Sequence, residues 1–78
     1  MTAQFLEYVT PWLVDNPDDV EITEVEGEGH SIVLEVSVHP DDMGKIIGKQ
    51  GRIIRSLRTL ARAAGQRGDQ SIMVEVVD

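Results

Sequence analysis

The sequence predicts a small α+β domain with the element order α-β-β-α-α-β, in which three helices pack on one face of a three-stranded mixed sheet. Apolar residues alternate over residues 32–38 and again over residues 72–76, as they do in strands with one buried face. Between these strands, residues 54–64 carry an apolar stripe at helical spacing. Strands joined by a helical crossover run parallel in one sheet, so we expect the last two strands to pair in that way.

The first expected helix covers residues 3–15, where apolar residues recur at helical spacing. The residues on this expected inner face are Phe5, Val9, Trp12 and Leu13, with Leu6 beside them. Pro11 lies within the helix and predicts a kink, because proline cannot donate the helical hydrogen bond. The NPDD sequence at residues 16–19 predicts a turn that ends this element.

A hairpin is expected next, with strands at residues 20–26 and 31–38 and a turn at Gly27 and Gly29. Pro40, Asp41 and Asp42 then suit the first turn of a helix, since carboxylates are favourable at its positive end.

A short helix over residues 42–47 is expected to be followed by the sequence GKQG and by a longer helix over residues 52–64. Gly65 and Gly68 are expected to stop this helix before the strand at residues 71–77.

Charge is sharply segregated along the chain. All seven Lys and Arg residues lie between residues 45 and 67, and all fourteen Asp and Glu residues lie outside that block. A solvated helix face would explain many charge runs, but segregation this complete favours an anionic ligand or an acidic partner surface.

The composition excludes several other classes. The chain has no cysteine, so neither a disulfide nor a thiolate metal site is expected. No apolar run approaches the ~20 residues of a membrane span, and the N-terminus lacks the pattern of a signal peptide. We therefore expect a single domain over residues 1–78, in the cytoplasm and without a membrane partner.

The glycines of the GKQG sequence (residues 48–51, the GKQG loop) can bring backbone N–H groups close to a ligand, because glycine has no Cβ. The first turn of the following helix adds free N–H groups and a positive dipole end. A phosphate at Gly48–Gly51 would meet these groups together with Lys49 and Arg52. A GxxG sequence alone would favour an ordinary helix–loop–helix turn, because the pattern is common.

The surrounding sequence adds specificity. IIGKQGRII, set between a strand–helix and a helix–strand, is similar to the signature of KH domains, and the preceding helix and hairpin resemble the type II arrangement. In length, and in DNPDDVEI, HPDDMGKIIGKQGR and LRTLARAAG, the chain closely resembles the small bacterial single-KH proteins of the KhpA family.

This resemblance implies single-stranded RNA binding, in which the loop clamps about four nucleotides by their backbone. It assigns the clamp to Gly48, Lys49, Gln50 and Gly51, and the apolar wall of the base groove to Ile47 and Ile54, although both isoleucines also suit the core. The strand at residues 31–38 would form the opposite wall. Among the remaining cations, Lys45, Arg52 and Arg55 are expected to contact phosphates. For Arg58, Arg62 and Arg67, contact with RNA and a solvated helix face both remain open.

The resemblance also implies a homodimer, pairing with a larger multidomain KH protein of the KhpB type, and work as an RNA chaperone or post-transcriptional regulator. It further implies links to cell shape and cell-wall biogenesis. Candidate contact residues are Trp12, Ile53, Leu60 and Met73, although core packing is the favoured reading for each.

Two other function classes are considered. An enzyme is not expected, because neither His30 nor His39 has a nucleophile at a recognisable spacing, and no cofactor or metal is expected. A protein-interaction module that docks an acidic partner on the basic helix face is the alternative. The three aromatic residues lie outside the basic block, so a base-stacking platform is not supported.

Overall fold

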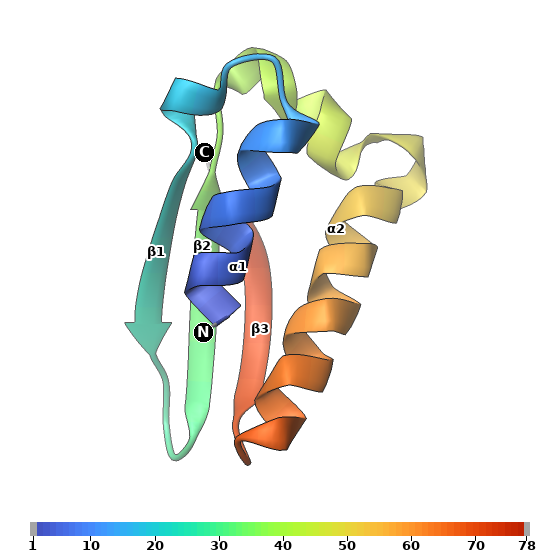
Figure 1. Cartoon of the computed structure of the whole chain (residues 1–78). Coiled ribbons are helices and arrows are strands. Elements are labelled where there is room, and N and C mark those ends of the chain that lie inside the picture. Colours follow the sequence, from blue (N-terminus) through green and yellow to red (C-terminus); the bar gives the residue numbers. More distant parts are fainter. Residues whose placement is uncertain (1, 78) are drawn as a thin grey trace.

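The computed structural model describes residues 2–77 (Figure 1). Its helices and strands are α1 (Thr2–Val9), β1 (Glu21–Glu26), β2 (Ser31–Ser37), α2 (Met43–Arg67) and β3 (Ser71–Val77). Short 3-10 helices lie at Thr10–Leu13, Pro17–Asp19 and Pro40–Asp42. The first of these directly continues α1 and contains Pro11, so the α-helix ends at Val9 and passes into a 3-10 helix at the proline where a kink is predicted.

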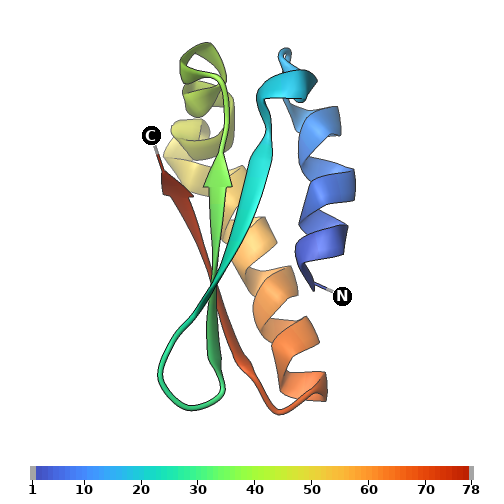
Figure 2. The same ribbon diagram turned by 90° about the vertical axis from the view of Figure 1, so that its left-hand side faces the viewer.

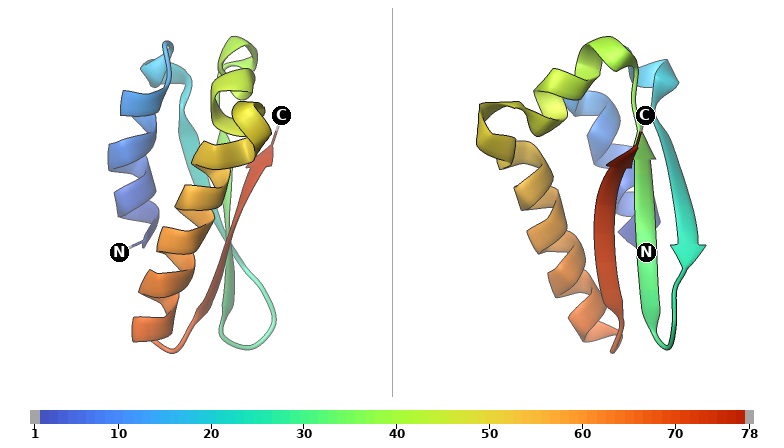
Figure 3. Two further views of the ribbon diagram at one scale, coloured as in Figure 1. Left: turned by 90° about the vertical axis from the view of Figure 1, so that its right-hand side faces the viewer. Right: turned by 180° about the vertical axis from the view of Figure 1, so that it is seen from behind.

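The sheet is mixed and has the strand order β1-β2-β3. β1 pairs with β2 in antiparallel register, and β2 pairs with β3 in parallel register across the α2 crossover. Both helices lie on the same face of the sheet, which leaves the other face without a covering element within residues 2–77 (Figures 2 and 3). The predicted three-stranded mixed sheet with helices on one side is thus confirmed.

The predicted count of three helices is not confirmed, because the two expected after β2 form a single element, α2. Its backbone leaves helical geometry at residues 48–51 and then resumes it. The chain changes direction there, so that α2 has a short limb before the GKQG loop and a long limb after it (Figure 3).

The core lies between the sheet and the helices. Ile54 and Leu57 are buried, as predicted, and they pack with residues of the inner faces of β2 and β3. The other buried hydrophobic residues of this cluster are Leu6, Leu34, Val36, Val38, Ile46, Ala61, Ile72 and Val74.

The predicted inner face of the first helix is confirmed for Leu6, Val9 and Leu13, which are buried or packed against the core, and is wrong for Phe5 and Trp12. Leu6 is fully buried, whereas Phe5 is 39% exposed and Trp12 is 77% exposed. Core packing was also the favoured prediction for Leu60 and Met73, and both are exposed. Helical spacing alone allows the inner face to be centred on Phe5 or on its neighbour Leu6. In the structure Leu6 is buried in the core, so the face centred on Leu6 is the inner one.

The end of α2 also differs from the prediction. Gly65 does not stop the helix but lies buried inside it, and the helix continues to Arg67 with Gly68 as its C-cap residue. A Cβ on Gly65 would lie 2.6 Å from the backbone oxygen of Gln70 and 2.9 Å from Cγ1 of Ile72. Gly65 is therefore the residue that lets α2 approach β3 closely.

Asp42 anchors the start of α2 to the segment that follows α1. It is buried, and its carboxylate accepts hydrogen bonds from the backbone N–H groups of Asp15 and Asn16 and from the Asn16 side chain, at 3.0–3.2 Å. The sequence-based expectation for Asp42 was an interaction with the helix end, but the structure shows no side-chain capping bond. Its carboxylate instead connects the start of α2 to Asp15 and Asn16, which lie 27 and 26 residues earlier in the chain.

Candidate nucleic-acid interface

The GKQG loop makes its turn at Lys49, Gln50 and Gly51, whose left-handed conformation the sequence did not predict. Gly48 has φ −72° and ψ 179°, an extended conformation open to any residue. The three residues after it are all left-handed, with φ 51° at Lys49, 63° at Gln50 and 71° at Gly51. For residues with a side chain this conformation costs about 1–2 kcal/mol each. The loop thus holds two strained non-glycine residues in sequence, a feature that is concentrated at functional sites.

The two glycines of the loop have different functions in the backbone. Nothing lies within 4 Å of the position that a Cβ on Gly48 would occupy, so the backbone there is open to an approaching ligand. Gly51 supplies the last left-handed residue, and a Cβ there would lie 3.3 Å from Cγ2 of Ile54. Only Gly51 is therefore required by the turn itself.

The side chains next to this open backbone are polar and exposed. Lys49, Gln50 and Arg52 all project into solvent, and the long limb of α2 begins directly after them. The free N–H groups and the positive dipole of a helix start favour an anion at this position. The loop therefore combines accessible backbone, a helix start and two cations within a few residues.

The two isoleucines that flank the loop are placed differently. Ile47 is 47% exposed, whereas Ile54 is only 5% exposed and belongs to the core cluster. Of the two predicted groove residues, Ile47 is therefore the one with substantial accessible surface. Ile54 packs in the core next to Gly51 of the loop.

The predicted phosphate contacts fall into two groups. Arg52 and Arg55 are exposed and line one shallow hollow on α2 together with Ser56, Thr59 and Leu60. Lys45 lies on the short limb, where its Nζ is 3.2 Å from a carboxylate oxygen of Asp15. This ion pair is exposed, so it is weak and does not hold Lys45 strongly.

Arg58 has a defined contact that the sequence did not reveal. Its Nε donates a hydrogen bond to the backbone oxygen of Val74 in β3, at 3.0 Å. The available signal was its position four residues after Ile54, at the margin of the buried stripe. Arg62 and Arg67 are exposed on the same helix.

The expected opposite wall of a groove is also placed differently. β2, the strand proposed for that wall, is the central strand and is paired on both sides. The strand at the sheet edge beside α2 is β3 (Figure 1). Any groove between the long limb of α2 and the sheet is thus bordered by β3.

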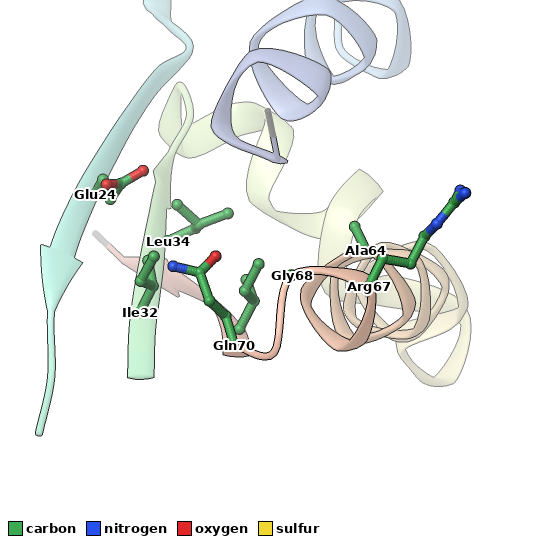
Figure 4. A pocket seen from close by; sticks show the side chains of 8 residues that line it. Glu24, Ile32, Leu34, Ala64, Arg67, Gly68 and Gln70 are labelled. Carbon is green, nitrogen blue, oxygen red and sulfur yellow. The ribbon is translucent and has the colours of Figure 1, made fainter. Parts of the chain in front are cut away.

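A cavity of about 340 Å³ opens where α2 ends and β3 begins (Figure 4). Its floor is apolar, with Ile32 and Leu34 from β2, and Glu24 and Gln70 lie at its rim. Arg67 also borders it, but its side chain extends away from the two strands in this view. None of the predicted site residues lines this cavity, so it is separate from the GKQG loop.

Two further properties of residues 2–77 bear on function. No group of three or more His, Asp or Glu side chains within that range is arranged to hold a metal ion. The helices of the same range include none that is long and apolar enough to cross a membrane.

Comparison with known proteins gives a consistent result. A family model described as "KhpA/KhpB, KH domain" matches residues 3–76. A Clostridium acetobutylicum protein named RNA-binding protein KhpA is 49% identical over 74 residues, which are 95% of this chain and 97% of that protein. Proteins of the same name from Halalkalibacterium halodurans and Streptomyces coelicolor are 45% and 46% identical; the alignments cover 94% and 100% of this chain, and 95% and 94% of those proteins. No solved structure matches the chain.

Proposed function

This chain belongs to the KhpA/KhpB family of KH-domain proteins, and we propose that it binds single-stranded RNA by clamping the RNA backbone with its GKQG loop. KH domains hold about four nucleotides in this way. We further propose that residues 1–78 act as one KH domain of the type II arrangement, which the helix and hairpin before the loop support.

The observation that carries the proposal is the open backbone at Gly48 beside the strained, exposed residues Lys49 and Gln50. A phosphate group can reach the backbone there because no side chain blocks it. The start of the long limb of α2 favours its negative charge, and Lys49 and Arg52 add cationic side chains. Left-handed geometry at Lys49 and Gln50 is a local cost that the proposed clamp explains.

The neighbouring residues have graded functions in this proposal. Arg55 follows Arg52 along α2 and contacts phosphates outside the clamp. Ile47 offers an apolar surface to a base, while Ile54 beneath the loop supports its shape. Lys45 joins the site when its weak ion pair with Asp15 opens.

The test is the double variant Lys49→Asp with Gln50→Asp, which keeps both loop glycines. Aspartate tolerates left-handed φ better than lysine or glutamine does, so the fold should persist. The phosphate site loses one positive charge and gains two negative charges. We expect affinity for an unstructured RNA oligonucleotide to fall more than about tenfold, or ~1.4 kcal/mol.

The matched control is Arg62→Asp with Gln66→Asp, which makes the same change of charge at two exposed positions of α2 far from the loop. This control should lose much less affinity than the loop variant. Equal losses would reduce the interaction to general charge attraction. A loop variant that binds RNA as well as the parent would refute the clamp and favour the docking of an acidic protein partner on the basic helix.

We also propose that the chain acts in the cytoplasm as an RNA chaperone or post-transcriptional regulator, as a homodimer and in complex with a larger KhpB-type protein. A site of about four nucleotides gives limited affinity, so a second linked site would raise the effective concentration. Exposed apolar side chains on the helical side support self-association, notably Trp12 and Leu60. Sedimentation at tens of micromolar should show a dimer; a monomer throughout would contradict this proposal.

A further inference from the structure

The face of the sheet turned away from both helices has a composition of its own. Leu34 and Val74 are buried on the helix side. Because successive strand residues point to opposite faces, their neighbours Val33, Glu35, Met73 and Glu75 point away from it. We call this surface, together with Val25 opposite Val33, the back of the sheet.

The strand register arranges these residues in two rows. Val25 lies opposite Val33, and Val33 lies opposite Met73, which makes an apolar row across all three strands. Val25 is 41% and Met73 is 56% exposed. The next row along the strands contains Glu35 directly opposite Glu75. Val33, between Val25 and Met73, is half-buried, so the apolar row presents accessible surface mainly at its two ends.

Glu35 and Glu75 repel each other without compensation in the described part of the chain. Adjacent strands lie about 4.8 Å apart, and like charges directly opposite one another are destabilising. The ion pairs among residues 2–77 are Lys45–Asp15 and His39–Asp41, neither of which involves these glutamates. The sheet itself contains no Lys or Arg, since all of them lie between residues 45 and 67.

We propose that the back of the sheet docks a basic, amphipathic segment of another protein. Apolar side chains of that segment cover the row Val25–Val33–Met73, and a lysine or arginine lies between Glu35 and Glu75. The carboxylate pair then becomes favourable, because each glutamate gains a cationic neighbour in a partly dehydrated contact.

Other occupants fit this surface poorly. The carboxylates of this surface repel RNA, and the strands contribute no Lys or Arg that could attract it. A second copy packed back to back would bring its own Glu35 and Glu75 against the first pair, which is unfavourable in a symmetric contact. The proposed segment also leaves the GKQG loop free, because α2 lies on the opposite side of the sheet (Figure 2). One molecule can therefore hold an RNA and a basic protein at the same time.

The probe is a short synthetic amphipathic peptide of leucine and lysine, titrated into the full chain and followed by NMR amide shifts. We expect the shifts to concentrate on the outward residues of β1, β2 and β3. The variant Glu35→Gln with Glu75→Gln should weaken peptide binding about tenfold. The control Glu26→Gln with Glu28→Gln removes the same charge from the hairpin end and should change binding less than about twofold.

The same glutamine variant also tests the repulsion, because its melting temperature should rise above that of the parent. In a separate titration without the peptide, an unstructured RNA oligonucleotide should shift amides at the GKQG loop and spare the back of the sheet. Equal weakening by both glutamine pairs would overturn the proposal in favour of general charge attraction. No binding, shifts centred on the helices, equal binding of a leucine–glutamate peptide, or RNA-induced shifts at the back of the sheet would each overturn it as well.

Discussion

Gly48 and Gly65 lie in the same helical element and differ in what surrounds them. The space beside Gly48 is empty within 4 Å, while a Cβ on Gly65 would meet the Gln70 backbone oxygen at 2.6 Å. The sequence places Gly48 in the GKQG loop and predicts Gly65 as a helix stop, but it does not show what surrounds either residue. Their surroundings assign Gly65 to the packing of α2 on β3, and leave Gly48 without any internal reason to be glycine.

At Gly48, as at Gly44, neither φ nor a neighbouring atom excludes alanine. Gly48 differs from Gly44 because it lies directly before the left-handed, exposed residues Lys49 and Gln50, where an approaching ligand gives the missing side chain a physical reason. The comparison therefore separates effects on folding from effects on binding, and the following variants test that separation in order of their expected effect on stability.

Gly65→Ala should have the largest effect on folding. The new Cβ conflicts with backbone rather than with a flexible side chain, so α2 must shift away from β3. Overpacking of this kind costs about 3 kcal/mol, which in a domain of this size lowers Tm by more than about 10 °C. Thermal unfolding followed by circular dichroism measures the loss.

Gly44→Ala is the control for this variant, because Gly44 also lies in α2 but has nothing within 4 Å of its Cβ position. It should gain about 0.5 kcal/mol from helix propensity. Similar melting of the two variants would mean that the close approach at Gly65 does not stabilise the fold.

Asp42→Asn should have the next largest effect, and it should depend on pH. Burial raises the pKa of the Asp42 carboxyl, but hydrogen bonds from Asn16 and from the Asp15 and Asn16 backbone, with the charge of His39, outweigh it. The pKa is thereby lowered from its ordinary value of 3.8. The ionised carboxylate thus stabilises the fold above that value, and this contribution disappears as the pH falls through the lowered pKa.

Melting should therefore differ most between the parent and Asp42→Asn near neutral pH, and the difference should shrink in acid. The exposed neighbour supplies the control, since Asp41→Asn should melt within a few degrees of the parent at neutral pH. A gap for Asp42→Asn that stays constant with pH would show that its carboxylate is not the stabilising group.

Gln50→Gly should stabilise the fold slightly. Relief of the left-handed strain at φ 63° is worth about 1–2 kcal/mol, and the greater freedom of glycine in the unfolded chain takes back about 0.5–1 kcal/mol. The same substitution in regular helix, Gln66→Gly, should instead destabilise by about 0.8 kcal/mol. Urea unfolding of both variants should show opposite signs; equal signs would deny that Gln50 is strained.

Gly48→Ala should have the smallest effect on folding, within about 0.5 kcal/mol. Its effect on RNA should be clear, because the added methyl group occupies the space that a phosphate would use. We expect affinity for an unstructured oligonucleotide to fall about threefold or more, or ~0.7 kcal/mol, while Gly44→Ala binds like the parent. Unchanged RNA binding by Gly48→Ala would remove the external explanation for this glycine.

The strands and the long limb of α2 could be predicted from the sequence, because each has one buried face and a regular period. The alternation around Leu34 and Val74 and the spacing of Ile54 and Leu57 have this property. The inner face of α1 could not be predicted in the same way, since Phe5 and Leu6 are adjacent and each begins a plausible stripe. Only the sheet decides between them.

The site shows the same division. The basic, glycine-containing segment could be found in the sequence, and the structure keeps Lys49, Gln50 and Arg52 together at its surface. Which residues carry the left-handed turn, and that Asp42 faces Asn16, depend on contacts between distant segments. A single sequence shows residue types in order, and it does not show which of them tertiary packing brings together.

The hydrogen bond from Arg58 to Val74 has a consequence for aggregation. β3 is an edge strand, and the outward N–H and C=O groups of such an edge can recruit a strand from another molecule. Arg58 places a positive charge on that edge and occupies the carbonyl oxygen of Val74, near the middle of the strand. The other edge, β1, carries three glutamates, which repel a second copy of itself. Both edges of the sheet are thus protected from growth into fibrils. The Arg58 side chain protects β3, and the negative charge of its own glutamates protects β1.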